Sequence, residues 1–258
     1  MTQRIESLTN AKIKQLVRLL DSSKERKKEK SFVLEGLRLC LDCLNNSAIK
    51  AESLFFTEDC FKKNEALLGD IPGRLPSFVI TEAIAKKLAR TESSQGVFLL
   101  CRMPEEACEI SPFGKYLALE NVQSPDNFGA ICRCAEAMGL DGIIVSGGVD
   151  VFNPKALRAS MGSALRLNII KADNLCEVLE RLGKNGMKLF AAVPDSSALK
   201  VSDFTFDGGA VVIIGNEANG VSQEAKALCT LLTIPMKGRA ESLNAAAAAA
   251  IIAWEMAQ

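Results

Sequence analysis

The residues Val211-Val212-Ile213-Ile214-Gly215-Asn216-Glu217-Ala218-Asn219-Gly220 join a short apolar run to a polar turn that begins and ends with glycine. An apolar, β-branched run of this length is typical of a buried strand. Similar runs occupy 116–119, 143–146, 189–193 and 231–234, and helical segments lie between them at 128–138, 153–161, 174–182, 222–229 and from 243 to the end. Apolar strands that alternate with helices predict a mostly parallel sheet covered on both faces, so the second half of the chain is expected to be an α/β fold.

The first hundred residues also alternate between helix and strand. Helices are predicted at 10–20, 37–44 and 81–88, and strands at 32–34, 53–57, 77–80 and 96–101. Residues 103–114 contain two prolines and three acidic residues and follow no period, which is typical of a connection between domains. We therefore predict a first domain at 1–103, a linker at 104–114 and a second domain at 115–258.

The composition excludes several classes of protein. Hydrophobic residues make up 48% of the 258 residues, which is ample for a packed core. No apolar run approaches the roughly 20 residues that span a bilayer, and the first residues lack the apolar stretch of a signal peptide. A cytoplasmic protein without membrane attachment is therefore expected. The absence of histidine removes the usual general base near neutral pH.

Nine cysteines are scattered along the chain. Cys40 and Cys43 form a CxxC pair, but no second pair and no histidine completes a zinc site. Both lie in a segment with a helical apolar face, which favours core packing over metal or redox chemistry. No metal is expected, and scattered thiols fit a reducing compartment.

Three candidate segments begin at the ends of predicted strands, at 121–133, 215–220 and 234–244. Because ligands of parallel sheets bind beyond the carboxyl ends of the strands, these loops are candidate sites. Taken alone, each has an ordinary interpretation. The first loop starts a helix that Asp126 or Asn127 could cap, with Arg133 exposed on it. The second could be a tight turn, since it has neither the GxGxxG spacing of dinucleotide sites nor the lysine of a P-loop.

The third loop leads into an unusual helix. Ser242 is a plausible N-cap for that helix, which contains six consecutive alanines at 245–250. Side chains this small allow close packing of backbones, so an interface or a tightly packed core is expected there.

Together the three loops resemble the signature motifs of the SpoU family of RNA ribose methyltransferases. The first motif is similar to Asn127-Phe128-Gly129-Ala130-Ile131-Cys132-Arg133-Cys134-Ala135, the second to 215–220, and the third to Ile234-Pro235-Met236-Lys237-Gly238-Arg239-Ala240-Glu241-Ser242-Leu243-Asn244. The segment 153–162 also resembles the family. Residues 7–20 and 32–36 resemble the substrate-binding domain of many members, a small α/β fold similar to a ribosomal RNA-binding protein.

This resemblance implies an enzyme that uses S-adenosylmethionine to methylate a ribose 2′-hydroxyl of RNA, with ribosomal RNA favoured over transfer RNA. It also implies a C-terminal domain tied in a deep trefoil knot and a homodimer formed through that domain. The residues implied in donor binding are Gly215, Asn216, Ile234, Met236, Gly238, Ser242 and Leu243. Those implied in catalysis are Asn127, Arg133, Glu217, Ser242 and Asn244. Two departures, Cys134 where threonine is common and the alanine run, leave these positions intact.

The expected roles differ among these residues. Arginine has been favoured as the base in this family, but an arginine with a pKa of at least about 12.5 needs roughly 7 kcal/mol to lose its proton at pH 7. We therefore expect Arg133 to clamp the target phosphate and stabilise the forming alkoxide. Asn127 and Asn244 would position groups through hydrogen bonds, and Glu217 would hold Arg133 or Asn127. For Asn127, a simple helix cap remains an alternative.

Basic residues gather at the start of the chain. Residues 1–30 carry nine basic and four acidic residues, a charge of +5 on a protein of zero net charge. Charge alone allows either phosphate binding or a solvated helix face, and the resemblance favours RNA. The residues predicted to contact RNA are Lys12, Lys14, Arg26, Lys27, Lys28 and Arg158.

Two other functions compete with this hypothesis. An RNA-binding accessory protein without catalysis would be favoured by a damaged motif, but Arg133, Glu217 and Asn244 are all intact. A nucleotide-using enzyme on an ordinary doubly wound sheet would be favoured by GxGxxG or P-loop spacing, and neither is found at these loops.

Overall fold

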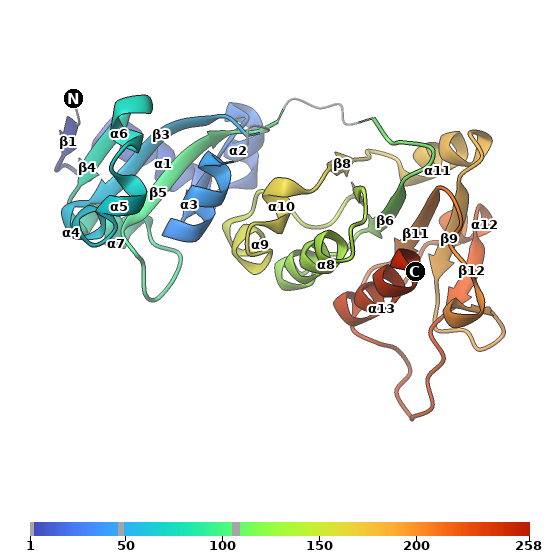
Figure 1. The fold of residues 1–258 in the computed structure, drawn as a ribbon. Helices are drawn as coiled ribbons and strands as arrows, with labels where there is room; N and C mark the ends of the chain where they lie inside the picture. The colour runs from blue at the N-terminus through green and yellow to red at the C-terminus, as the bar shows by residue number, and fades with distance from the viewer. Residues whose placement is uncertain (1–2, 46–48, 105–108) are drawn as a thin grey trace. The chain divides into compact units, whose positions relative to one another are not determined.

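The computed structural model describes residues 3–45, 49–104 and 109–258, which form two compact units (Figure 1). Unit 1 comprises Met1–Glu105 and Phe152–Leu165, and unit 2 comprises Glu106–Val151 and Arg166–Gln258. The first division falls inside the predicted linker, of which residues 105–108 lie outside the described residues. Residues 152–165, called the docked segment below, group with unit 1, whereas the domain prediction assigned them to the second domain.

Unit 1 contains a mixed five-stranded sheet in the order β1-β4-β3-β5-β2, in which β5 runs antiparallel to both neighbours. Its strands are β1 (Gln3–Ile5), β2 (Ser31–Glu35), β3 (Ala51–Thr57), β4 (Ser77–Ile80) and β5 (Val97–Arg102). Its helices are α1 (Ala11–Asp21), α2 (Ser23–Glu29), α3 (Leu37–Leu44), α4 (Glu58–Lys63), α5 (Glu65–Leu68), α6 (Ile71–Arg74), α7 (Glu82–Leu88), α9 (Pro154–Ala159) and α10 (Ser163–Arg166), the last ending one residue beyond the docked segment. The elements predicted for 1–103 are all present, whereas β1, α2 and α4 to α6 were not predicted.

The core of unit 1 forms where α1 and α7 pack on the sheet. Asn10 caps α1, because its side-chain oxygen accepts the N–H of Lys12 at 2.9 Å. The apolar residues of α1 recur at helical spacing and are buried with those of α7 and the strands. Cys40 and Cys43 are buried on α3, as the core-packing interpretation predicts.

The docked segment follows β7 (Gly142–Ser146) in the sequence but packs against β2 of unit 1. The rings of Phe152 and Phe32 lie 4.6 Å apart between centroids, and both side chains are buried or nearly so. Asn153 caps α9 by accepting the N–H of Lys155 at 2.8 Å. Nothing in the local sequence pattern signals this packing, because its partners lie about a hundred residues earlier in the chain.

Unit 2 contains a seven-stranded sheet in the order β10-β12-β9-β11-β6-β7-β8, and every strand pair in it is parallel. Its strands are β6 (Lys115–Glu120), β7, β8 (Ile169–Lys171), β9 (Lys188–Ala192), β10 (Leu199–Lys200), β11 (Ala210–Ile214) and β12 (Thr230–Thr233). Its helices are α8 (Pro125–Ala137), α11 (Leu175–Lys184), the 3-10 helix η1 (Val201–Asp203), α12 (Gln223–Ala227) and α13 (Ala245–Ala257). The predicted α/β fold with a parallel sheet is confirmed, and β8 and β10 were not predicted.

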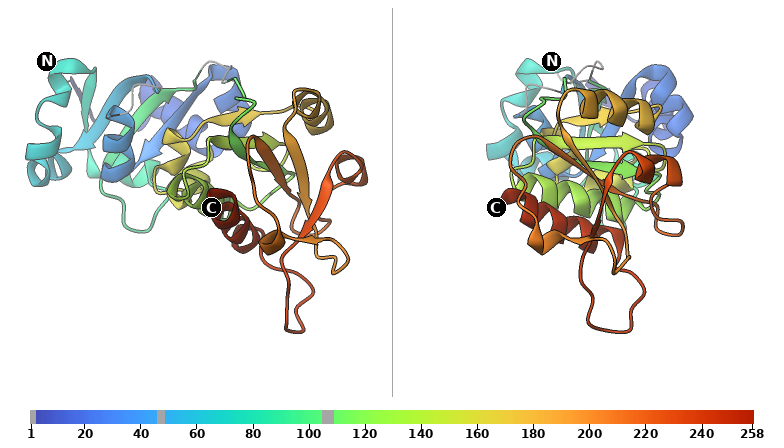
Figure 2. Two further views of the ribbon diagram at one scale, coloured as in Figure 1. Left: turned by 45° about the vertical axis from the view of Figure 1, so that its right-hand side comes forward. Right: turned by 90° about the vertical axis from the view of Figure 1, so that its right-hand side faces the viewer.

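Helices cover both faces of this sheet (Figure 2). α11 and α12 pack on one face, against alternate residues of the central strands that include Ala118 and Ile213. α13 packs against α8 and the strands β6 and β11 on the other face. Both faces of β11 are therefore buried, which explains its uninterrupted apolar sequence. Across the described residues, no helix has the length and apolarity needed to cross a membrane.

Candidate active site

Three loops meet beyond the carboxyl ends of the parallel strands of unit 2. The first loop (121–124) joins β6 to α8, the second (215–222) joins β11 to α12, and the third (234–244) joins β12 to α13. β6 and β11 are hydrogen-bonded neighbours, with Leu119 beside Ile214, so the first two loops start side by side. The predicted placement of the candidate loops at one sheet edge follows from this register.

Glu217 of the second loop binds the start of α8. Its carboxylate accepts the backbone N–H groups of Gln123 and Ser124, both at 3.2 Å, and the side-chain N–H of Asn127 at 2.8 Å. Partial burial acts to raise the pKa of Glu217, but the hydrogen bonds from Asn127 and from backbone N–H groups outweigh it and lower the pKa below its ordinary value. Glu217 is therefore a carboxylate that holds Asn127, whereas Arg133 is not among its partners.

Asn127, in the first turn of α8, connects the second loop to the third. Its side-chain oxygen accepts the side-chain N–H of Asn244 at 3.0 Å, while its own N–H group donates to Glu217. Each amide is thereby fixed in one orientation, because donor and acceptor are both used. Glu217, Asn127 and Asn244 form a hydrogen-bonded chain, called the amide chain below, that links all three loops.

The helix caps differ from those predicted. Ser124 caps α8, since its hydroxyl accepts the backbone N–H of Asn127 at 3.3 Å, and Pro125 occupies the first turn. Asn244 caps α13 by accepting the N–H groups of Ala246 at 2.9 Å and Ala247 at 3.3 Å. Asp126, Asn127 and Ser242 are therefore not the caps, and the side chain of Asn127 is available for the amide chain.

Two further contacts bind the first loop to the second. Asn216 donates its side-chain N–H to the carbonyl oxygen of Asn121 at 2.8 Å and accepts the N–H groups of Ala218 and Asn219. Glu120, buried at the end of β6, accepts the backbone N–H of Ser222 at 2.8 Å and its hydroxyl at 2.6 Å. The side chain of Asn216, predicted to bind the donor, is thus engaged in shaping the second loop.

Glycine is required at the base of the second loop. A Cβ atom on Gly215 would lie 2.2 Å from the carbonyl carbon of Gly220 and 2.3 Å from the nitrogen of Val221. The same turn is closed by a pair of backbone hydrogen bonds between Asn216 and Gly220. The backbone at Gly215 therefore lies so close to the backbone of Gly220 and Val221 that no side chain fits at position 215.

A cavity of about 660 Å³ opens between the second and third loops. Six of the seven residues predicted to bind the donor line it, and Gly238 does not. Of the residues predicted to be catalytic, Glu217, Ser242 and Asn244 line it. Asn127, which is hydrogen-bonded to Glu217, and Arg133 both belong to α8 and do not line it. Arg133 is exposed, and its guanidinium forms no hydrogen bond or ion pair with any residue that the structure describes.

Sequence reasoning missed one wall of the cavity. Ala192, Val193 and Pro194 at the end of β9 line it, as does Lys226 of α12. A signal for the first group was present, because Val193 ends a predicted strand at the same sheet edge and Pro194 follows it. Lys226 could not have been found from spacing, since it is one of many scattered cations.

The basic residues predicted to contact RNA fall into two groups. Lys12, Lys14, Lys27 and Lys28 are exposed on α1 and α2. Arg26 is only 3% exposed and donates to the carbonyl oxygens of Leu19 and Leu20 at the end of α1, so its assignment to RNA is wrong. It closes the end of one helix where a phosphate has no access.

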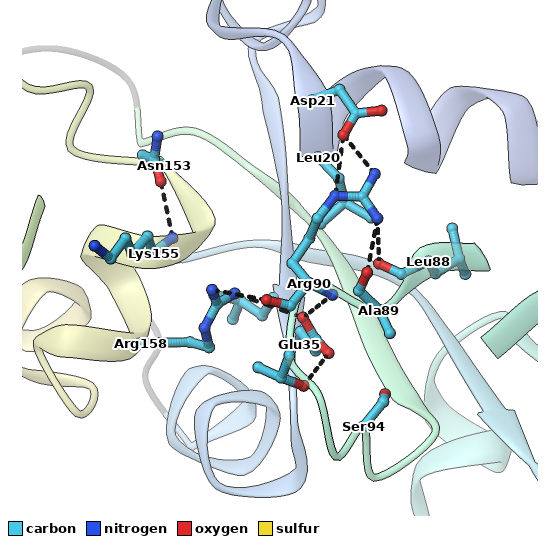
Figure 3. Close-up of polar contacts among 12 residues, drawn as sticks. Leu20, Asp21, Glu35, Leu88, Ala89, Arg90, Ser94, Asn153, Lys155 and Arg158 are labelled. Atoms are coloured by element: carbon cyan, nitrogen blue, oxygen red, sulfur yellow. Dashed lines mark hydrogen bonds and ion pairs between the residues drawn. The ribbon is translucent and has the colours of Figure 1, made fainter. Parts of the chain in front are cut away.

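Arg158 also departs from its predicted role. It lies on α9, and its guanidinium faces Glu35 and the carbonyl oxygen of Arg90 within unit 1 (Figure 3). Its side chain is 27% exposed, against 3% for the carboxylate that it meets. The described residues contain no cluster of acidic or cysteine side chains arranged to hold a metal ion.

Comparison with known proteins agrees with this geometry. The profile of the SpoU rRNA Methylase family matches residues 114–254, which include the three loops and the cavity. The chain belongs to the SpoU family. A second profile, that of the MRM3-like substrate binding domain, matches residues 10–99 of this family member.

Relatives of this SpoU protein align over its whole length. The 23S rRNA (guanosine(2553)-2′-O)-methyltransferase RlmP of Bacillus subtilis is 30% identical over 98% of this chain and 99% of its own. The crystal structure of an AdoMet-bound rRNA methyltransferase from Sinorhizobium meliloti superimposes with a TM-score of 0.87 at 28% identity, covering 99% of this chain and 97% of that one. AviRb from Streptomyces viridochromogenes, also with AdoMet, gives 0.85 at 27% identity, covering 96% and 97%.

Proposed function

We propose that this SpoU family member transfers the methyl group of S-adenosylmethionine to a ribose 2′-hydroxyl of ribosomal RNA. The observation that carries the proposal is the amide chain, which joins the three motif loops beside a cavity of about 660 Å³. The B. subtilis relative, which is named for this reaction on 23S rRNA, matches the chain from end to end. Ribosomal RNA is therefore favoured over transfer RNA.

The cavity has the properties that a bound donor needs. When bound, the donor supplies an electrophilic methyl group on a positively charged sulfur. Val193, Leu232 and Ile234 give the cavity an apolar wall suited to a flat heterocycle. Residues 235–243 make no backbone–backbone hydrogen bond with described residues, so their N–H and C=O groups are available to the polar edge of that heterocycle. We assign donor binding to the lining residues Gly215, Ile234, Met236, Ser242 and Leu243, and leave Gly238 out.

Arg133 supplies positive charge rather than a base. Its guanidinium has no partner among the described residues, so it is free to meet a phosphate or the oxygen that gains negative charge during the transfer. The amide chain fixes the polar groups of Asn127 and Asn244 next to the cavity, where they orient the incoming ribose. Glu217 acts through Asn127 and is a positioning residue.

A trefoil knot and a homodimer complete the proposed architecture. α13 packs against β6 and β11, which are three and two positions from β12 in the sheet, so the chain passes the ends of two strands to reach it. This path supports a knot. α13 also leaves Ile251 and Trp254 exposed, at 38% and 54%, on an apolar helix, which supports a second copy as their partner.

The first half of the chain is proposed to hold the RNA. It matches a substrate-binding domain, and it carries five exposed lysines on α1 and α2, among them the predicted Lys12, Lys14, Lys27 and Lys28. We accordingly assign residues 1–103 to substrate binding and 115–258 to methyl transfer, in a cytoplasmic enzyme that uses no metal.

Mapping of 2′-O-methylated nucleotides tests this proposal. Ribosomal and transfer RNA from cells with and without the gene would be compared at every position. One ribosomal nucleotide is expected to lose its methyl group in the deletion strain and to regain it with the wild-type gene. A site in transfer RNA, or identical maps in both strains, would overturn the proposal.

A further inference from the structure

Arg158 meets a buried carboxylate at the end of β2. One terminal nitrogen of its guanidinium lies 3.5 Å from an oxygen of Glu35, whose side chain is only 3% exposed. The other terminal nitrogen donates to the carbonyl oxygen of Arg90 at 3.2 Å. The two groups come from residues 123 positions apart in the sequence and face each other in unit 1 (Figure 3).

Among the residues that the structure describes, Arg158 is the one cation paired with Glu35. Its carboxylate accepts the backbone N–H of Arg90 at 2.9 Å and the hydroxyl of Thr91 at 2.8 Å, both of which are neutral donors. A buried carboxylate is costly unless a cation and hydrogen bonds compensate for the lost water. Arg158 therefore supplies the positive charge that compensates for the desolvation of Glu35.

Arg90, the second partner of Arg158, makes several hydrogen bonds of its own. The guanidinium of Arg90 donates to Asp21 at 3.0 Å and to the carbonyl oxygens of Leu88 and Ala89 at 3.1 and 2.9 Å, which closes the end of α7. Figure 3 shows Arg90 held between these groups and the carboxylate of Glu35. Arg158 thus binds a carbonyl group whose own residue is hydrogen-bonded to both α1 and α7.

The contact between Arg158 and Glu35 matters because of where the docked segment lies in the chain. The segment lies in the sequence between β7 and β8, two strands of unit 2, yet its packing partners Phe32 and Glu35 belong to β2. The chain crosses from unit 2 to unit 1 after Val151 and returns after Leu165. If the docked segment were released from unit 1, the chain between β7 and β8 would become a long flexible connection.

We propose that Arg158 is a positioning residue that acts through Glu35. Their ion pair holds the docked segment on unit 1 and thereby couples the unit proposed to bind RNA to β7 and β8, two strands of the sheet whose other strands β9, β11 and β12 lead to the proposed donor site. The inference rests on the proposed function for its effect on RNA methylation, but the contact itself does not. It replaces the predicted role of Arg158 in binding phosphate, for which a guanidinium already shared between a carboxylate and a carbonyl is poorly placed.

A double-mutant cycle on the full chain tests the proposal. Arg158→Ala, Glu35→Gln and the double variant would be compared with wild type in kcat/KM for ribosomal RNA, in donor Kd by calorimetry, and in hydrogen–deuterium exchange. Lys155→Ala is the matched control, because Lys155 is a cation on the same helix that is not a partner of Glu35. Figure 3 shows its side chain directed away from Glu35. Arg158→Lys tests rescue by a cation that retains the ion pair but lacks the planar fork.

Both single variants are expected to lower kcat/KM for RNA by about 10-fold, and the double variant by no more than either. Donor Kd stays within about twofold in all of them, Lys155→Ala matches wild type, and Arg158→Lys recovers part of the loss. Exchange of the amides in 152–165 is expected to accelerate in both single variants.

Three outcomes would overturn the proposal. Wild-type kcat/KM in Glu35→Gln with a loss in Arg158→Ala would indicate direct RNA contact, as would losses that multiply in the double variant. Unchanged exchange in 152–165 would show that the pair does not hold the segment. If Arg158→Ala fails to fold, Arg158→Lys and Glu35→Gln decide. If wild type binds the donor but methylates no RNA, the proposed function fails, and the exchange experiment still tests the contact.

Discussion

Arg133 and Arg158 lie on helices that follow neighbouring strands of one sheet, and both were predicted to meet RNA, but their surroundings are opposite. Arg133 is exposed on α8, a helix whose first turn belongs to the amide chain, and it has no partner among the described residues. Arg158 is mostly buried on α9 and shares its charge with Glu35. An arginine in a motif-like sequence can therefore either bind a ligand or pair with a carboxylate inside the protein. Its burial and its partners distinguish the two roles.

The difference teaches where charge is available for chemistry. A guanidinium paired with a buried carboxylate stabilises that carboxylate and cannot leave it without a large loss of stability. An exposed guanidinium without a partner contributes little to folding and is free to bind an anion. Substitution of the two arginines is accordingly expected to give opposite patterns in activity and stability.

The largest effect is expected at Arg133. Arg133→Ala removes the charge that we propose stabilises the forming alkoxide, so kcat should fall by about 100- to 1,000-fold, while the free energy of unfolding changes by less than about 0.5 kcal/mol. Arg133→Lys should retain part of the activity. Single-turnover methylation, donor calorimetry and thermal unfolding measure the three quantities. A lysine variant as inactive as alanine, with RNA and donor binding preserved, would contradict a role of charge alone.

Arg158→Ala should show the reverse pattern. Leaving Glu35 buried with two neutral donors is expected to cost about 2–3 kcal/mol, a little below the usual range because Arg158 is 27% exposed. For a chain of this size, each kcal/mol lowers Tm by roughly 2–4 °C. Chemical denaturation of both variants compares the free energy of unfolding of Arg158→Ala with that of Arg133→Ala. Equal stability of the two variants would remove the distinction between these arginines.

Gly215→Ala sharpens the comparison by disturbing the site without changing any charge. Its methyl group would meet the backbone of Gly220 and Val221, and relief of such overpacking costs about 1–3 kcal/mol. Donor Kd should therefore rise by roughly 10-fold or more. Gly238→Ala is the control, because a Cβ there meets nothing within 4 Å. Isothermal calorimetry that finds the same Kd for both variants would argue against Gly215 as part of the donor site.

The smallest effect concerns pH. Because the pKa of Glu217 is lowered in the folded protein, its contribution to stability is present above its ordinary value near 4.5 and is lost as the pH falls through the lower, folded value. The difference in Tm between wild type and Glu217→Gln should thus be constant near neutral pH and shrink below about pH 4.5. Scanning calorimetry at several pH values measures it. A difference that grows in acid would reverse the sign and refute the hydrogen-bond assignment.

Sequence predicted the sheet of unit 2 well, and the physical reason is local. Runs such as Val211–Ile214 are buried on both faces, and such strands have no other stable environment. Two helix caps were assigned wrongly, because Ser124 before Pro125 and Asn244 before the alanine run compete with neighbouring residues that also favour caps. The choice between them depends on tertiary partners such as Glu217.

The features that the sequence did not predict depend on contacts between residues far apart in the chain. The pairing of Arg158 with Glu35 and of Phe152 with Phe32 joins segments that share no local pattern, so the packing of the docked segment on unit 1 was not predicted. Arg26 was misassigned for a similar reason, since its burial depends on where α1 ends. The three site loops were found because parallel strands bring their ends together whatever lies between them.

The central claim is methyl transfer to a ribose 2′-hydroxyl, and one measurement tests it most directly. Purified enzyme would be incubated with ribosomal RNA and S-adenosylmethionine that carries a deuterated methyl group, and the RNA digested to nucleosides for mass spectrometry. A single labelled nucleoside with the label on its ribose is the expected product, and it should be lost in Arg133→Ala. Label on a base, or no label although the donor binds, would contradict the account.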